Sequence, residues 1–241
     1  MAIVVVLPLA PSESSGKGGA CPSGMAQVAV DGISAYCIDR WEASLIELQG
    51  KIQAAHKPTL PVGKVDAMAV THSGVVPQGY ISKVEAEAAC KRSKKRLCTG
   101  AEWERACRGK TPTLYPYGDE QRPGYCNDSG KAPLASLHPD LGENVYASAE
   151  AMNDHRINEA PGTVAATGSY PHCRNGFGVY DMVGNLHEWV ADVHDGTRGT
   201  FRGGYYQDTH INGDGCTYKT SAHDVSYHDY STGFRCCADS K

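Results

Sequence analysis

The sequence predicts an irregular α+β fold that has little regular secondary structure and is cross-linked by disulfides. Only one hairpin and two capped helices can be recognised, and from Thr111 onward almost no periodic segment is present. The 241 residues include 27 Gly and 13 Pro, which indicate many turns and long connections. A stretch without periodicity usually indicates disorder. Here it contains many aromatic residues and five of the ten cysteines, so we expect cross-links and bound ions to order it.

The N-terminal segment, residues 1–20, is expected to lie outside the folded domain. MAIVVVLPLA is apolar but too short to span a bilayer, and it resembles the hydrophobic part of a signal peptide without the preceding basic residues. SESSGKGGA then has the composition of a flexible linker. We therefore interpret residues 1–20 as a leader remnant and linker, and residues 21–241 as a single domain.

Three local elements can be predicted. Two apolar runs between Met25 and Asp39 meet at Asp31-Gly32, a good hairpin signal. Ser82 and Glu85 form a capping box ahead of an Ala-rich helix, whose solvated side we expect to include KRSKKR, residues 91–96. Thr99 begins a second capping box, and its helix is expected to end at Gly109.

Charge and cysteine usage exclude some classes of protein. The net charge is −4 and KRSKKR is the longest basic run, so the broad cationic surface that nucleic acids require is missing. The cysteines are even in number and scattered, without a CxxC pair, which favours disulfides over zinc. Disulfides indicate an oxidising compartment, so we expect a secreted or periplasmic protein that does not span a membrane.

The string GVYDMVGNLHEWVAD, residues 178–192, is the most unusual segment. Two carboxylates, Asp181 and Glu188, flank Gly184, and Trp189 directly follows Glu188. The apolar positions do not alternate as in a half-buried strand, and Gly184 interrupts a helical pattern. From its residues alone the string is compatible with a metal site, with a turn around a buried Trp, or with catalytic machinery.

The order of several motifs resembles the formylglycine-generating enzyme (sulfatase-modifying factor) family. CIDRWEAS comes first, followed by the helix that contains Cys90, by KRLCTGAEWERACRG, by GVYDMVGNLHEWVAD, by FRGGYY and finally by STGFRCCAD. The resemblance covers about residues 25–239. It implies an irregular, C-type-lectin-like fold that is stabilised by calcium and disulfides.

The resemblance also implies ligands for calcium. In the family the segment that matches residues 178–192 wraps this ion, and the matching ligands are the side chains of Asp181 and Glu188 and the carbonyl groups of Gly184 and Leu186. Such a set suits calcium, which takes six to eight oxygen ligands. A second family site would match Asn127 and Asp128, with partners near residues 158–161.

One departure concerns the catalytic cysteine pair of the family, which binds copper. The segment that begins at RGG is RGGYYQDTHINGDGC. Alignment from RGG places Asp208 at the first cysteine, and alignment back from Cys216 places Tyr206 there. The second cysteine falls on Ile211 or Gly213. Without thiolates to favour Cu(I), no copper is expected at this position. The catalytic residues are therefore unknown, and formylglycine formation is not expected.

The resemblance further implies that Cys216 is structural and pairs with Cys107, and that Cys236 pairs with Cys90. Proximity across the N-terminal hairpin favours a third pair, Cys21–Cys37. The remaining four cysteines would then form Cys126–Cys173 and Cys98–Cys237.

Two functions remain open for the C-terminal third, where histidines, carboxylates and tyrosines are concentrated. The leading hypothesis is a secreted, calcium-stabilised binding or structural module with an unidentified protein, peptide or glycan ligand, and tyrosines suit such recognition. A lectin-like variable binding protein of the same fold is a variant of it. The alternative is an oxidoreductase of altered chemistry that holds non-haem iron or copper through groove histidines. The candidate groove residues are Tyr205, Tyr206, Asp208, His210, His223 and His228.

Overall fold

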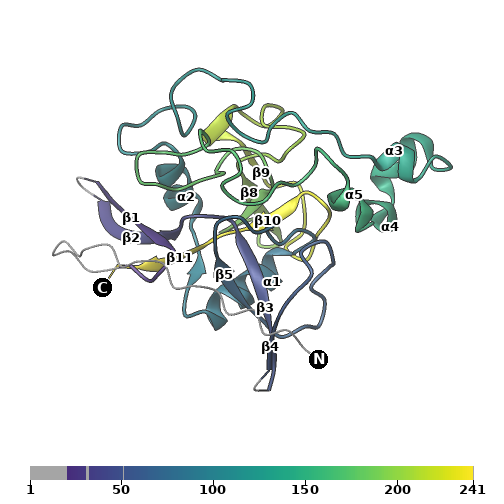
Figure 1. Cartoon of the computed structure of the whole chain (residues 1–241), viewed down its shortest axis with the longest axis horizontal. Helices are drawn as coiled ribbons and strands as arrows, with labels where there is room; N and C mark the ends of the chain where they lie inside the picture. The colour runs from purple at the N-terminus through teal and green to yellow at the C-terminus, as the bar shows by residue number, and fades with distance from the viewer. Residues whose placement is uncertain (1–20, 31–32, 51, 241) are drawn as a thin grey trace.

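The computed structural model describes residues 21–30, 33–50 and 52–240. The predicted leader and linker, residues 1–20, and the predicted turn at Asp31-Gly32 lie outside these residues. The strands on either side of that turn pair as expected, since β1 (Met25–Val30) runs antiparallel to β2 (Ile33–Asp39). The fold mixes short helices with short strands, and much of the chain is turn or irregular (Figure 1).

Three small sheets organise the described part of the chain. In the first, β11 (Cys236–Asp239) lies between β2 and β6 (Arg96–Leu97), so the C-terminal strand extends the N-terminal hairpin. The second has the order β10-β7-β8-β9 and consists of Thr232–Phe234, His187–His194, Arg198–Arg202 and Lys219–Thr220. The third places β3 (Ala43–Gln49) between β4 (Ile52–Ala55) and β5 (Ala67–Thr71).

Both predicted helices begin at the predicted capping boxes. Ser82 and Glu85 cap α1 (Lys83–Arg92), and Thr99 and Glu102 cap α2 (Gly100–Cys107). In each box the hydroxyl accepts the third N–H of the helix and the Glu accepts the N–H of the cap residue, which satisfies two donors that would otherwise lack partners.

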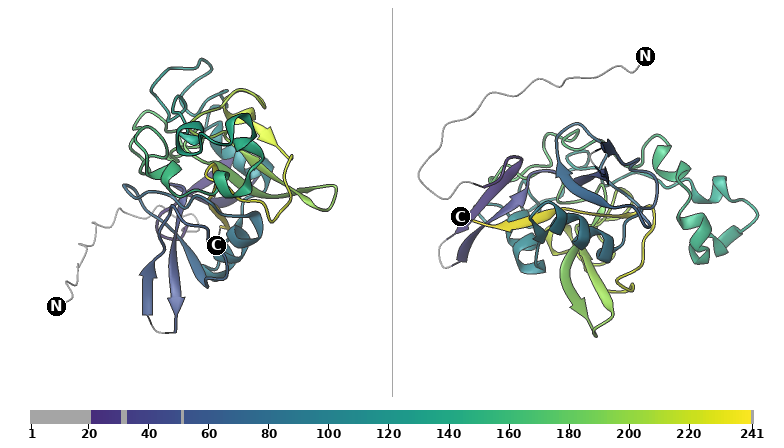
Figure 2. Two further views of the ribbon diagram at one scale, coloured as in Figure 1. Left: turned by 90° about the vertical axis from the view of Figure 1, so that its right-hand side faces the viewer. Right: turned by 90° about the horizontal axis from the view of Figure 1, so that it is seen from below.

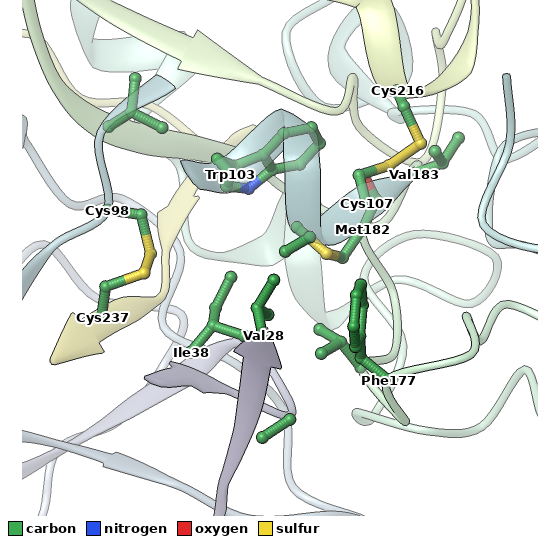
Figure 3. Close-up of a cluster of buried hydrophobic side chains, with 14 of the residues drawn as sticks. Val28, Ile38, Cys98, Trp103, Cys107, Phe177, Met182, Val183, Cys216 and Cys237 are labelled. Carbon is green, nitrogen blue, oxygen red and sulfur yellow. A yellow bond between two sulfur atoms is a disulfide. The ribbon is translucent and has the colours of Figure 1, made fainter. Parts of the chain in front are cut away.

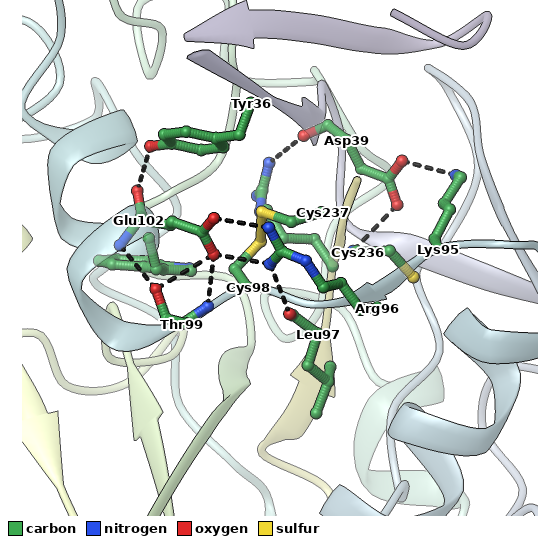
Figure 4. The surroundings of a disulfide bond; sticks show 12 residues. Tyr36, Asp39, Lys95, Arg96, Leu97, Cys98, Thr99, Glu102, Cys236 and Cys237 are labelled. Atoms are coloured by element: carbon green, nitrogen blue, oxygen red, sulfur yellow. Dashed lines mark hydrogen bonds and ion pairs between the residues drawn. A yellow bond between two sulfur atoms is a disulfide. The ribbon is translucent and has the colours of Figure 1, made fainter. Parts of the chain in front are cut away.

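The expectation that KRSKKR is a solvated helix face is wrong for its second half. α1 ends at Arg92, and Lys95 donates from Nζ to Oδ1 of the buried Asp39 at 2.6 Å. Arg96 lies in β6 and forms a forked pair with Glu102, at 2.7 Å for each N–O contact. Figure 4 shows both cations around the Cys98–Cys237 disulfide. Lys95 therefore pairs with the carboxylate of Asp39 in β2, which is buried and requires a partner, and Arg96 joins β6 to α2.

Four short helical turns form a lobe at one side of the molecule: α3 (Leu134–Leu137), η1 (Gly142–Ala147), α4 (Ala149–Met152) and α5 (Arg156–Glu159). This helical lobe projects beyond the sheets in two views (Figures 1 and 2). It packs a small apolar cluster that includes Val145 and Ile157 against Tyr206 and Tyr230.

Two larger clusters fill the interior. One surrounds Trp103 and contains Val28, Ile38, Met182 and three disulfides, two of which are labelled in Figure 3. The other surrounds Trp189 and contains Leu45, Ile81 and Phe234. Five disulfides join the predicted pairs, and they account for all ten cysteines, each of which lies in the described residues. They are Cys21–Cys37, Cys90–Cys236, Cys98–Cys237, Cys107–Cys216 and Cys126–Cys173.

Candidate functional site

The string of residues 178–192 is a series of tight turns that leads into a buried strand. Asp181, Gly184 and Asn185 have φ values of 57°, 77° and 56°. A Cβ on Gly184 would lie 2.1 Å from the carbonyl oxygen of Asn127, so only glycine fits there. The string is not wholly irregular, however, because Glu188 and Trp189 lie in β7. The first four residues of β7 are all buried, which explains why no alternation was visible.

Glu188 is the centre of a buried polar cluster. Its Oε2 accepts hydrogen bonds from Trp103 Nε1 and Arg235 Nε, each at 2.6 Å, and its Oε1 accepts one from Arg235 at 2.6 Å. Arg235 and Glu188 are both almost completely buried. Such a forked pair compensates the cost of burying either charge alone.

A third carboxylate, Glu42, lies beside this pair and was not singled out by sequence. Its oxygens accept hydrogen bonds from the amide of Asn185 at 2.5 Å and from the N–H of Leu186 at 3.1 Å. Burial raises the pKa of Glu42 well above its ordinary value, and the charges of Asp181 and Glu188 raise it further. Burial also raises the pKa of Asp181, to about 6. Three buried carboxylates therefore share one guanidinium.

Calcium binding by Asp181, Gly184, Leu186 and Glu188 stays a prediction, and Glu188 is already paired with Arg235. Oε1 of Glu188 accepts a single hydrogen bond, so it retains an unused lone pair. Oδ2 of Asp181 accepts the N–H of Gly168 at 2.7 Å, whereas its Oδ1 accepts no hydrogen bond among the described residues. Carboxylate oxygens combined with carbonyls in a tightly curled segment are typical of calcium sites.

The two segments predicted to bind calcium are directly linked. The N–H of Asn185 donates to the carbonyl of Asn127 at 2.8 Å, and the amide of Asn127 donates back to Oδ1 of Asn185 at 2.9 Å. The predicted partner Asn158 is engaged elsewhere, since its amide donates to the carbonyl of Tyr230 at 2.6 Å. Asp128 accepts from Gln121 at 3.2 Å. The second calcium site therefore stays a prediction for which this arrangement adds no support.

The candidate groove contains a group of rings around His187, which we call the aromatic cluster: His187, Phe201, Tyr205, Tyr218, His223 and Tyr227. Ring centroids of Phe201, Tyr205 and Tyr218 lie 4.4, 4.8 and 5.4 Å from that of His187. His187 is 5% exposed, and its Nδ1 has no hydrogen-bond partner within the described residues. Burial lowers the pKa of His187 to about 3, so the imidazole is neutral.

The rest of the aromatic cluster extends outward from His187. His223 stacks on Tyr227 with ring centroids 3.9 Å apart and on Phe201 at 5.8 Å. Tyr218 donates to Oδ2 of Asp208 at 2.8 Å. A cavity of about 300 Å³ lies next to Tyr227, between that residue and the helical lobe. It is lined by Tyr146, Ala147, Ala149, Met152, Asn153, Ser226, Tyr227 and His228. Aromatic faces beside a cavity suit ligand binding.

Three predicted groove residues have other surroundings. Tyr206 is completely buried and donates to Asn158 at 3.3 Å. His210 contacts Asp214 at 2.7 Å and Gln121 at 2.9 Å. His228 contacts Asn153 at 2.7 Å and lines the cavity. Within the described part of the chain, no three His, Cys, Asp or Glu side chains converge as a metal centre. The arrangement therefore adds no support for the iron or copper alternative.

His187 and Tyr218 lie outside the predicted groove segments, residues 205–214 and 223–230, whereas Tyr227 lies within the second. A lone histidine after a glycine-rich turn has no distinguishing pattern, and its ring neighbours come from β8 and from loops. The only sequence signal for the cluster is the high density of aromatic residues between positions 201 and 230.

The fold and the site together define a disulfide-linked protein of mixed helices and sheets, with a buried carboxylate cluster and a cluster of aromatic rings that adjoins a cavity at Tyr227. Residues 33–240 match the family model described as "Sulfatase-modifying factor enzyme 1-like domain". The chain belongs to this family. No helix in the described residues is both long and apolar enough to cross a membrane.

Several known proteins are similar to this chain. The formylglycine-generating enzyme of Mus musculus is 31% identical over 195 residues, which cover 70% of this chain and 46% of that protein. The enzyme of Thermomonospora curvata is 30% identical over 193 residues, covering 68% and 55%. The chain thus spans about half the length of these curated relatives. "Inactive C-alpha-formylglycine-generating enzyme 2" of Bos taurus is 32% identical over 117 residues, covering 48% and 32%.

Two solved structures share the fold. PvdO from Pseudomonas aeruginosa has a TM-score of 0.51 at 18% identity and covers 85% of this chain and 80% of its own. CarF has a TM-score of 0.52 at 17% identity, covering 92% and 95%. At these identities the likeness concerns the fold alone.

Proposed function

We propose that this chain is a secreted, calcium-stabilised member of the family that binds a ligand in its groove and does not oxidise cysteine. One observation carries the proposal. Cys216, the cysteine next to the expected catalytic segment, is joined to Cys107, and the residues nearby are tyrosines packed around the buried ring of His187. A disulfide sulfur is not a thiolate and cannot hold Cu(I).

The aromatic cluster supports ligand binding for a physical reason. Tyrosine rings offer apolar area and a hydroxyl at low cost in conformational entropy. Tyr146 is 62% exposed at the rim of the cavity, and Tyr227 belongs to both the cavity and the aromatic cluster. A peptide or glycan could therefore contact the helical lobe and the loop of residues 226–228 at the same time.

The calcium part of the proposal is supported by the charge balance. Glu42, Asp181 and Glu188 carry three negative charges when ionised, and Arg235 supplies one positive charge. A divalent cation at the turns of residues 181–188 would compensate the other two. The five disulfides support secretion, because such bonds persist in oxidising compartments. The C-type-lectin-like classification of the fold stays a prediction.

The decisive experiment tests oxidation and binding on the same preparation. The copper-loaded protein is incubated with a cysteine-containing sulfatase peptide, with an active formylglycine-generating enzyme as positive control, and aldehyde is measured by mass spectrometry. We expect no aldehyde above the copper-free background. Copper-dependent aldehyde formation would contradict the proposal.

Binding is tested with an immobilised glycan array and a peptide library. The expected result is a ligand whose binding weakens in Tyr227→Ala and Tyr146→Ala. The control is Tyr170→Ala, a tyrosine that packs against the Trp103 cluster and belongs neither to the cavity nor to the aromatic cluster. A ligand whose binding falls equally in all three variants would not be bound by the groove.

A further inference from the structure

A second cavity in the described part of the chain is separate from the aromatic cluster and its adjoining cavity. It has a volume of about 530 Å³ and lies between the end of α2, the segment of residues 113–125 and the loop of residues 171–176. We call it the cationic pocket. It is lined by Arg108, Gly109, Lys110, Thr111, Thr113, Pro116, Tyr117, Tyr125, Pro171, His172, Arg174, Asn175 and Gly176.

The charge of this lining is one-sided. It contains Arg108, Lys110 and Arg174, together with His172, and no Asp or Glu, although the chain as a whole carries a net charge of −4. Only Arg108 has a carboxylate partner among the described residues, Glu104 at 3.0 Å. Arg174 donates to the hydroxyl of Tyr180 at 3.1 Å, a neutral acceptor. Two cations of the lining, Lys110 and Arg174, therefore have no carboxylate partner among the described residues.

An aromatic wall stands next to these cations. The rings of Tyr117 and Tyr125 meet edge to face at 5.0 Å, and the ring of His172 stacks on Tyr125 at 4.6 Å. Thr111 and Thr113 add hydroxyl groups to the lining. Flat rings contact the apolar face of a sugar, whereas hydroxyls and cations pair with its polar and charged substituents.

Disulfides hold each wall of the pocket in place. Arg108 follows Cys107, Tyr125 precedes Cys126, and Cys173 lies between His172 and Arg174. The loop is also fixed from beneath, because the buried amide of Asn175 donates to the carbonyl of Ala106 at 2.7 Å and accepts from the N–H groups of Phe177 and Val179. A pocket that is rigid before binding loses little entropy when a ligand enters.

We propose that the cationic pocket binds an anionic sugar, a monosaccharide or chain end that carries a carboxylate or a sulfate. Lys110 and Arg174 hold the anionic group, and the wall of Tyr117, Tyr125 and His172 contacts the ring. The inference is independent of the groove, since none of the pocket residues belongs to the aromatic cluster or to its adjoining cavity.

The test is titration of the isotope-labelled protein with three probes, glucuronic acid, glucose 6-sulfate and neutral glucose, followed by NMR. We expect the amide signals of Lys110, His172 and Arg174 to shift with at least one anionic sugar and not with glucose. Comparing the first two probes distinguishes the carboxylate from the sulfate. No shift with either anionic sugar would overturn the proposal, as would inorganic sulfate that binds as tightly as the sulfated sugar.

Charge-reversal variants separate a specific site from general attraction. Lys110→Glu and Lys64→Glu change the net charge equally, and Lys64 is an exposed lysine outside the pocket. Lys110→Glu should weaken anionic-sugar binding by at least about tenfold, as expected for loss of a hydrogen bond to a charged group. Lys64→Glu should leave it unchanged. Equal losses in the two lysine variants would show non-specific attraction. His172→Ala should also weaken binding, and an unchanged affinity in that variant would contradict the proposed contact between the sugar ring and the aromatic wall. Tyr227→Ala should retain binding here, which keeps this test separate from that of the groove.

Discussion

Arg235 reaches Glu188 through two nitrogens and thereby joins the segment between β10 and β11 to the centre of the second sheet. The same guanidinium donates to the carbonyls of Asp39 and Tyr180, at 3.0 and 2.9 Å. One buried cation therefore links three regions of the chain that are far apart in sequence.

Replacing Arg235 by Leu should destabilise the protein by about 3–5 kcal/mol, because it leaves the buried Glu188 without its partner. The matched control is Arg198→Leu, which breaks an exposed pair with Asp195 and should cost less than about 1 kcal/mol. Urea unfolding measures both. Equal effects would show that the buried pair has no special role in stability.

Calcium should raise the melting temperature, and a chelator should lower it, because an ion that binds only the native state stabilises by mass action. Asp181→Asn should abolish most of this response while keeping an oxygen for the N–H of Gly168. Glu188→Ala is the poorer test, since it also frees Arg235. The control is Asp195→Asn at an exposed position. Identical melting curves with calcium and with excess chelator would contradict the prediction.

The disulfides should stabilise more the longer the loops that they close, with a logarithmic dependence on loop length. Removing Cys107–Cys216, with a sequence separation of 109, should cost about 4–5 kcal/mol in the chain-entropy model. Removing Cys21–Cys37, with a separation of 16, should cost about 3 kcal/mol. Paired Cys→Ser variants in urea test the order, and peptide mapping without reduction tests the pairs. A free thiol at Cys107 or Cys216 would be inconsistent with the structure.

His187 should make the protein less stable in acid. Burial lowers its pKa to about 3, so between this value and about 6.5 the unfolded chain binds a proton that the folded chain does not. The free energy of unfolding is unaffected above about pH 6.5 and falls as the pH drops through this window. At pH 5.5 the loss is about 1.4 kcal/mol relative to neutral pH.

The control for this effect is His187→Gln, which cannot take up the proton. Urea unfolding at pH 7.5 and 5.5, in calcium-containing buffer, should show the additional loss in the natural protein and not in the variant. The same pH dependence in both proteins would exclude His187 as its source.

The sequence predicted the local elements and cross-links more readily than the site. Capping boxes at Ser82 and Thr99 act over three residues, so a short window contains the whole signal. The strand at Glu188 was missed because burial on both faces removes alternation. Glu42 was missed because its contact with Leu186 spans 144 residues, and no local pattern reports such a contact. The aromatic cluster depends likewise on rings brought together from separate loops.

The position of β11 between β2 and β6 has a consequence for the order in which the protein matures. Cys236 and Cys237 supply partners for Cys90 and Cys98, which precede them by 146 and 139 residues. During synthesis, the first sheet stays incomplete and these two early thiols lack their native partners until residues 236–239 have left the ribosome. Oxidation that begins sooner would pair Cys90 or Cys98 with the wrong cysteine. Correct maturation therefore requires either delayed oxidation or the reshuffling of early bonds by thiol–disulfide exchange.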